Sequence, residues 1–301
     1  SGWCYSFGFV SWVIVFGNCI MVLVIAVLGP KMWELAKRYR YITPADLLAD
    51  RYPSDWVRLI TALIGFLFVF PYVATQIMGG GIIIQNMTNG EVPFYIGATI
   101  ITVFMLAYII LGGFRAVAWT DVIQGFMMFI FLPLALAVIL SHIGGIGTLI
   151  AKISTTRPEL VTHPGAVPIG DPKKWLTLSL ILGTACWLQV QNWQRVYTPK
   201  DRATVIKMLP LHLWIVIFFY FCVLLFGFSG VILKPGLSPK EAEGIIPMLL
   251  TEYTPIWIWV PVMAGALAAC MSTADSQALS VGSVIARDFY EKLGTVSYTH
   301  L

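Results

Sequence analysis

The residues most able to do chemistry are the small and hydroxyl side chains between 265 and 283. At about 100° per residue they share one narrow helix face, which has Thr273 at its edge and is made of Gly265, Ala269, Ser272, Ser276, Ser280 and Ser283. One interpretation is close packing of membrane helices through small residues. The other is a site for a hard cation such as Na⁺, because hydroxyls and backbone carbonyls supply oxygen ligands without added negative charge.

Two carboxylates lie in or beside apolar sequence, Asp121 in AVAWTDVIQ and Asp275 in MSTADSQ. A carboxylate at membrane depth needs a partner for its charge, so each is a candidate for an ion path. Asp121 closely follows the Gly112-Gly113 pair, and it is equally well interpreted as a helix-start residue near the membrane surface. Asp275 lies deeper in its apolar stretch, which favours the ion-path interpretation.

Two further apolar stretches carry unusual polar or flexible residues. The first, 57–86, contains Pro71 and then Gln76 before three glycines, which indicates either a packing kink or a role in a pathway. The second, 174–193, and the residue after it hold more polar groups than a lipid-facing helix tolerates, namely Thr184, Gln189, Gln191, Asn192 and Gln194. This helix is predicted to line a cavity or contact a partner. Its latter part alternatively forms an interfacial belt through Trp193, Arg195 and Tyr197.

The elements that position these residues are predicted to be membrane-spanning helices. Of 301 residues 58% are hydrophobic and 11% charged, with a mean hydropathy of +0.82, whereas soluble domains carry about 25% charged residues. Crossing a bilayer takes about 20 helical residues. Seven stretches are long enough, and they lie near 7–29, 57–86, 92–112, 117–142, 174–193, 207–233 and 256–284.

Charge placement indicates topology rather than nucleic-acid binding. Lys and Arg concentrate in the loops on one side, which predicts that the loop 30–56 and Arg287 are cytoplasmic. The net charge of +4 forms no basic patch, so no nucleic-acid partner is expected. The four histidines are scattered without metal-ligand spacing, and no nucleophile and base pair or phosphate loop is visible. We therefore expect a multi-pass plasma-membrane protein whose environment is the lipid bilayer, and not an enzyme.

Two long motifs resemble those of the sodium/solute symporter family, which includes sodium/proline, sodium/pantothenate, sodium/monocarboxylate and sodium/glucose transporters. GGFRAVAWTDVIQ, from Gly112 to Gln124, is similar to one family signature. AACMSTADSQALSVGSVIARDFY, from Ala268 to Tyr290, is similar to a second. The segments ITPADLLADRY and QRVYTPKD add to the resemblance, which covers nearly the whole chain.

The resemblance implies an all-α integral membrane protein with the leucine-transporter-type inverted-repeat helix bundle. The seven spans then correspond to core helices two to eight, so that residues 1–293 form a single, partial transmembrane transporter domain and further membrane segments are expected upstream and downstream. The tail 294–301 leads into no further span. We interpret it as a non-family segment, for example a sequencing artefact.

The resemblance also implies site residues. A sodium ion would be held by the Ala269 carbonyl and the hydroxyls of Ser272 and Thr273, together with carbonyls of core helix one. A second cation or a coupling role is implied for Asp121, Asp275 and Ser276. Substrate contacts are implied for Asn18, Gln76, Thr184, Trp187 and Gln189.

The function so implied is sodium-coupled symport of a small organic solute by alternating access, with Na⁺ as the coupling ion and no organic cofactor. A monocarboxylate, pantothenate or an amino acid such as proline is the expected solute. Two alternatives stay open, since transporter-like modules of this family are also fused to histidine-kinase domains as sensors, and protons can replace sodium as the coupling ion.

Overall fold

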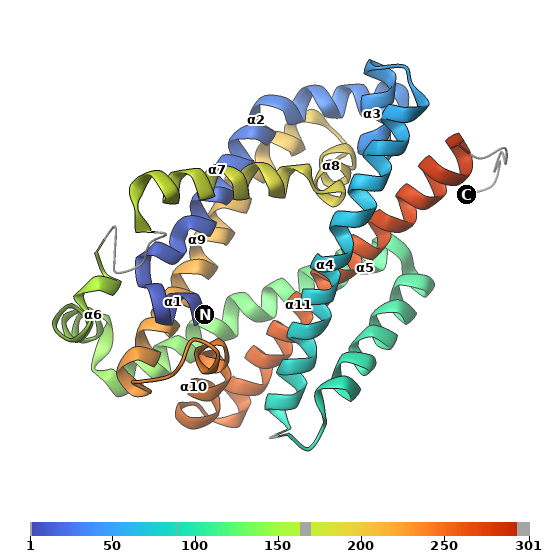
Figure 1. Ribbon diagram of the computed structural model, residues 1–301. Coiled ribbons are helices and arrows are strands. Elements are labelled where there is room, and N and C mark those ends of the chain that lie inside the picture. The colour runs from blue at the N-terminus through green and yellow to red at the C-terminus, as the bar shows by residue number, and fades with distance from the viewer. Residues whose placement is uncertain (1, 89, 163–169, 294–301) are drawn as a thin grey trace.

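The computed structural model describes residues 2–88, 90–162 and 170–293, and in these ranges the chain is helical without a strand (Figure 1). The predicted tail 294–301 lies outside the described residues. The helices are α1 (Gly2–Phe7), α2 (Val13–Tyr39), α3 (Pro44–Arg51), α4 (Asp55–Met87), α5 (Phe94–Ile143), α6 (Gly145–Thr156), α7 (Pro172–Leu188), α8 (Val190–Tyr197), α9 (Arg202–Leu233), α10 (Ile245–Tyr253) and α11 (Ile256–Val284), which continues as a π-helical turn, η5 (Ile285–Leu293).

Local sequence explains where several helices begin and end. Asp201 caps α9 and Asp171 caps α7, each by accepting backbone N–H groups of the first turn. Thr43 and Asp46 form a reciprocal capping box at the start of α3. The long α2 ends at Arg40, which adopts the left-handed conformation with φ 58°.

The long helices pack as two groups. One contains α4, α5 and α11, and the other contains α2, α7 and α9 with the short α8 (Figure 1). The largest core joins them where the second half of α5 meets α9, α10 and the start of α11, around the fully buried side chains of Ile139, Phe226, Phe228 and Ile258. A second core holds α8 against α2 and the start of α9.

Six of the seven predicted spans are confirmed, because six helices of the described chain are long and apolar enough to cross a membrane. The seventh, predicted over 174–193, is not one continuous helix. Helix α7 has 17 residues, a length of about 26 Å at 1.5 Å per residue, which is at the short end of helices that cross a bilayer. It stops because Gln189 takes an extended conformation with ψ 132°, and α8 then starts as a separate helix.

The predicted separation of the spans 92–112 and 117–142 is confirmed. Helix α5 is interrupted at Gly113, whose φ of 56° and ψ of −157° are non-helical. A positive φ is accessible to glycine without steric cost, whereas a Cβ makes it strained. The break divides α5 into two membrane-spanning parts, and it lies shortly before Asp121.

Candidate cation and solute site

The hydroxyl face of α11 presents its oxygen atoms one turn apart. The Thr273 hydroxyl donates to the Ala269 carbonyl over 3.1 Å, and the Ser276 hydroxyl donates to the Ser272 carbonyl over 3.0 Å. Ala269 is exposed, and Ser272 and Thr273 are half-buried in the described chain. Oxygen atoms from one helix face fill only part of a cation's coordination shell, so this face would need ligands from another segment.

Asp275 lies on the neighbouring, buried side of α11. Its side chain is fully buried, and the Tyr108 hydroxyl of α5 donates to Oδ2 over 2.5 Å. Within the described residues Oδ1 has no hydrogen-bond partner. An ionised carboxylate buried with half of its hydrogen-bonding capacity unmet is unstable without a cation or a proton nearby.

Asp121, in the second half of α5, approaches the hydroxyl face of α11. Its carboxylate lies beside Ser272 and within electrostatic reach of Asp275. Its Oδ1 is buried and lacks a partner among the described residues. The structure thus brings two carboxylates from different helices close to the hydroxyl residues of α11, Asp121 beside Ser272 and Asp275 on the adjacent buried side, an arrangement that suits a positively charged ligand. The cation role of these residues stays a prediction.

Two of the predicted solute residues flank a close helix crossing. Helices α2 and α7 touch at Gly17 and Gly183, where a Cβ on Gly183 would lie 2.6 Å from the Gly17 carbonyl oxygen. Asn18 and Thr184 follow directly in sequence. The Asn18 amide donates to the Ile14 carbonyl over 2.9 Å, and Thr184 donates to a carbonyl of its own helix. Both still have acceptor oxygens for a solute.

Trp187 and Gln189 lie where α7 breaks. Trp187 is 5% exposed and stacks on Trp193 with ring centroids 5.5 Å apart, and the Trp193 indole donates to the Trp187 carbonyl over 2.9 Å. This stacked pair fixes the break. The alternative of an interfacial belt is wrong for Trp193 and Tyr197, since both are buried in the core. Gln189 is half-buried, and its amide oxygen accepts from Gln191 over 2.9 Å.

Gln76 belongs to the other helix group. It lies on α4 one turn before Gly79, where α4 passes Cys270 of α11 so closely that an added Cβ would lie 3.3 Å from its sulfur. Gln76 therefore lies on the part of α4 that packs against α11, whereas Asn18 and Thr184 lie on α2 and α7. The assignment of these five residues to one solute site stays a prediction.

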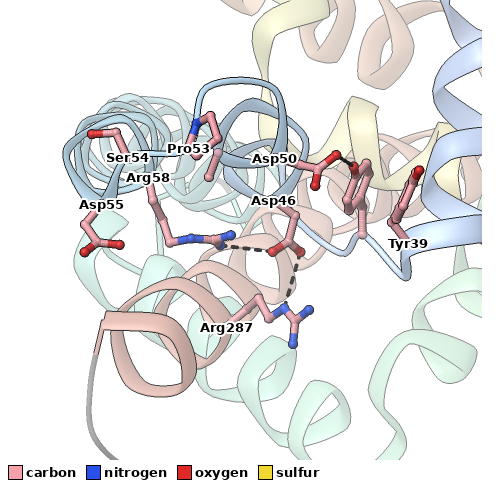
Figure 2. Close-up of a pocket in the computed structure, with 10 residues that line it drawn as sticks. Tyr39, Asp46, Asp50, Pro53, Ser54, Asp55, Arg58 and Arg287 are labelled. Carbon is pink, nitrogen blue, oxygen red and sulfur yellow. Dashed lines mark hydrogen bonds and ion pairs between the residues drawn. The ribbon is translucent and has the colours of Figure 1, made fainter.

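A cluster of ion pairs that the sequence did not predict joins α3, α4 and the end of α11. Arg58 Nη1 lies 3.0 Å from Asp46 Oδ1, and Arg287 Nε lies 3.3 Å from Asp46 Oδ2 (Figure 2). Arg58 Nη1 also lies 2.6 Å from Asp288 Oδ1. The Thr43 hydroxyl also donates to Asp288. The contacts agree with the predicted placement of loop 30–56 and Arg287 on one side of the membrane.

Electrostatics favour the ionised form of Asp46 in this cluster. Burial by itself raises the pKa of the carboxyl, but the hydrogen bonds from the Ile42 amide and Arg58 and the charges of Arg287 and Arg58 outweigh it, so the pKa lies below its ordinary value. A cavity of about 480 Å³ opens beside the cluster and is lined by Tyr39, Tyr41, Asp50 and Asp55 among others. The burial of Asp288 and Asp46 identifies the cluster as a structural clamp between helix ends.

Comparison with known proteins gives a consistent result. A sequence model described as "Sodium:solute symporter family" matches residues 1–297. The sodium/pantothenate symporter of Escherichia coli (strain K12) is 26% identical over 271 residues, which are 89% of this chain and 55% of that protein. The high-affinity proline transporter PutP of Bacillus subtilis (strain 168) is 28% identical over 263 residues, which are 84% of this chain and 53% of that protein.

A solved structure of a Na⁺-coupled sialic acid symporter, in a substrate-bound outward-open state, superposes with a TM-score of 0.81 at 18% sequence identity, covering 99% of this chain and 63% of that one. The predicted leucine-transporter-type bundle is thereby confirmed. The chain spans little more than half the length of the curated relatives it matches. These relatives are transporters, which fits the expectation that the chain is not an enzyme.

Because the family model matches nearly the whole chain and six helices of its described residues are able to cross a membrane, the chain is a multi-pass membrane protein and belongs to the sodium:solute symporter family.

Proposed function

We propose that this protein is a sodium-coupled symporter that carries a small carboxylate-bearing solute across the plasma membrane by alternating access. The observation that carries the proposal is that Asp121 and Asp275 lie within electrostatic reach of each other beside the hydroxyl residues of α11, in a chain of a symporter family. In this proposal sodium is a transported substrate, and no covalent step takes place.

The proposal gives the residues of α11 two roles. The Ala269 carbonyl with the Ser272 and Thr273 hydroxyls would bind one sodium ion, whose remaining ligands come from another segment. Asp121 and Asp275, with Ser276, would bind a second cation or pass its charge to the first site. What supports these roles is the oxygen-rich chemistry of the face, which suits a small hard cation.

The solute is proposed from chemistry that the relatives share. Pantothenate, proline and sialic acid, the solutes in the names of the compared proteins, all carry a carboxylate. Asn18, Thr184 and Gln189 offer amide and hydroxyl groups at the crossing and break of α7, with Trp187 supporting the break. Gln76 would contact the solute from α4. Discontinuous helices of this type form the binding sites of secondary transporters.

Sodium entry supplies enough free energy for uptake. One inward charge gains about 2.3 kcal/mol at about 100 mV, and a tenfold sodium gradient adds about 1.4 kcal/mol. The sum, roughly 3.7 kcal/mol, supports accumulation of a zwitterionic solute such as proline by several hundredfold. A monoanionic solute that moves with one sodium ion carries no net charge across the membrane, so the sodium gradient alone accumulates it about tenfold.

The test is uptake of labelled pantothenate, proline, lactate, acetate and glucose into proteoliposomes that contain the full-length protein. An inward sodium gradient is compared with an equal potassium gradient. We expect uptake of at least one carboxylate-bearing solute with sodium and background uptake with potassium. Uptake driven only by a pH gradient would replace sodium by protons as the coupling ion, and no uptake of any solute would contradict symport.

A further inference from the structure

The hydroxyl face of α11 is already contacted by a positively charged side chain of the protein. Arg195, on the short α8, donates from Nη2 to the Ser276 hydroxyl oxygen over 3.1 Å. Its charge also lies within electrostatic reach of Asp121. The guanidinium therefore contacts one of the groups that the proposed function gives to a second cation and acts electrostatically on another.

The same short helix makes a second polar contact with α11. The Ser280 hydroxyl, which is 1% exposed, donates to Gln194 Oε1 over 2.8 Å. Ser276 and Ser280 are one turn apart on the hydroxyl face, and Gln194 and Arg195 are adjacent on α8. The two hydrogen bonds are thus neighbouring links between α8 and α11.

These links connect the two helix groups of the fold. Helix α8 packs with α2 and α9, whereas α11 packs with α4 and α5. The extended residue Gln189 separates α8 from α7, so α8 is not a rigid continuation of that helix. A change in the contact between α8 and α11 therefore changes how the two groups are held together.

A sodium ion and the guanidinium cannot share the Ser276 oxygen without strong repulsion, because two unit charges a few ångströms apart repel strongly away from bulk water. We infer that Arg195 is an internal competitor of the coupling cation: cation binding at Ser276 and Asp121 displaces its side chain and loosens the contact between α8 and α11. The inference rests on the proposed function and deepens it, since it couples ion binding at this site to movement between the helix groups.

The first experiment measures sodium binding without transport. The thermal stability of the purified full-length protein is followed as sodium replaces potassium at constant ionic strength, since a ligand that binds the folded state stabilises it. For Arg195→Gln we expect the half-saturating sodium concentration to fall by about tenfold or more, because the competing charge is gone. Arg195→Lys keeps the charge and should stay closer to the wild type than Arg195→Gln.

The matched control is Arg202→Gln, which removes an equal charge seven residues further on. Arg202 pairs with Glu34 in an exposed ion pair, so its loss should leave the sodium dependence within about twofold of the wild type. An unchanged or higher half-saturating concentration in Arg195→Gln would overturn the inference. A wild-type protein with neither sodium-specific stabilisation nor sodium-dependent uptake would instead overturn the proposed function, and the inference with it.

A second experiment keeps Arg195 intact, so its outcome does not depend on whether the Arg195 variants fold. Gln194 and Ser280 are both replaced by cysteine in a background without the native cysteines, and the rate of disulfide formation is compared in sodium and in potassium. We expect sodium to slow the reaction, because displacement of Arg195 separates α8 from α11. Equal rates in the two salts would contradict the inference.

Discussion

Arg58 is predicted to be the most sensitive residue of the ion-pair clamp between α3, α4 and the end of α11. It is the only guanidinium that the described contacts place on Asp288, whose side chain is fully buried. In Arg58→Leu, Asp288 keeps the Thr43 hydroxyl at 3.1 Å but loses its ion pair, while Asp46 keeps Arg287 at 3.3 Å. The damage is therefore concentrated on Asp288.

Removing one partner of a buried ion pair costs about 3–5 kcal/mol, because the remaining charge is left without compensation. At about 2–4 °C per kcal/mol, the Tm should fall by roughly 6 to 20 °C. The assay is thermal unfolding of the detergent-solubilised full-length protein, followed by loss of the monodisperse peak in size-exclusion chromatography. A buried pair replaced by apolar residues is often nearly neutral, so Arg58→Leu combined with Asp288→Leu should recover much of the loss.

The control is Arg202→Leu, which removes the ion pair with Glu34. Both side chains of that pair are more than half exposed, at 60% and 51%, so the change should cost no more than about 1 kcal/mol. A Tm of Arg58→Leu within about 2 °C of the control would refute the reasoning on burial. So would a double variant that is no more stable than Arg58→Leu alone.

Three further predictions follow from the same structure. Gly183→Ala should destabilise the protein by about 1–3 kcal/mol in the same thermal assay, because the new Cβ would lie 2.6 Å from the Gly17 carbonyl oxygen. Gly147→Ala is the control and should be neutral or stabilising, because a Cβ at Gly147 would have no neighbouring atom within 4 Å. Ser272→Ala should raise the sodium concentration for half-maximal uptake by about tenfold, the loss of one ligand worth about 1.4 kcal/mol, and an unchanged sodium dependence would remove Ser272 from the site. The pKa of Asp46 is lowered in the folded state, so the ionised side chain contributes its full stabilisation above the unfolded pKa of about 3.9. This stabilisation is lost as the pH falls through the lower folded pKa. A pH scan of Tm in which Asp46→Asn shows the same acid dependence as the wild type would contradict this.

Much of the fold could be predicted from sequence because a bilayer imposes one strong pattern, a run of about 20 apolar residues for each span. The break at Gly113 was also predictable, since two glycines in an apolar run indicate a weak point. The end of α7 at Gln189 was not, because the following amides are equally compatible with one polar helix. The stacking of Trp187 on Trp193, which fixes the break, depends on tertiary packing.

The candidate site was only partly predictable, for a similar reason. Periodicity placed Ser272 and Ser276 on one face of one helix, where spacing alone is sufficient. The contacts of Tyr108 with Asp275 and of Arg195 with Ser276 join residues 167 and 81 positions apart, and no local pattern reports such pairs. The T-x-x-D spacing from Thr43 is the one signal that could have indicated a capping role at the clamp.

In the proposed mechanism sodium and solute cross the membrane together, and following both in the same vesicles tests this directly. Full-length protein in proteoliposomes is given ²²Na⁺ outside, with and without the solute found in the uptake panel. Sodium-coupled symport predicts that the solute increases ²²Na⁺ entry and that sodium increases solute entry, both to a lesser extent in Ser272→Ala. Solute uptake that leaves ²²Na⁺ entry unchanged would contradict sodium-coupled symport.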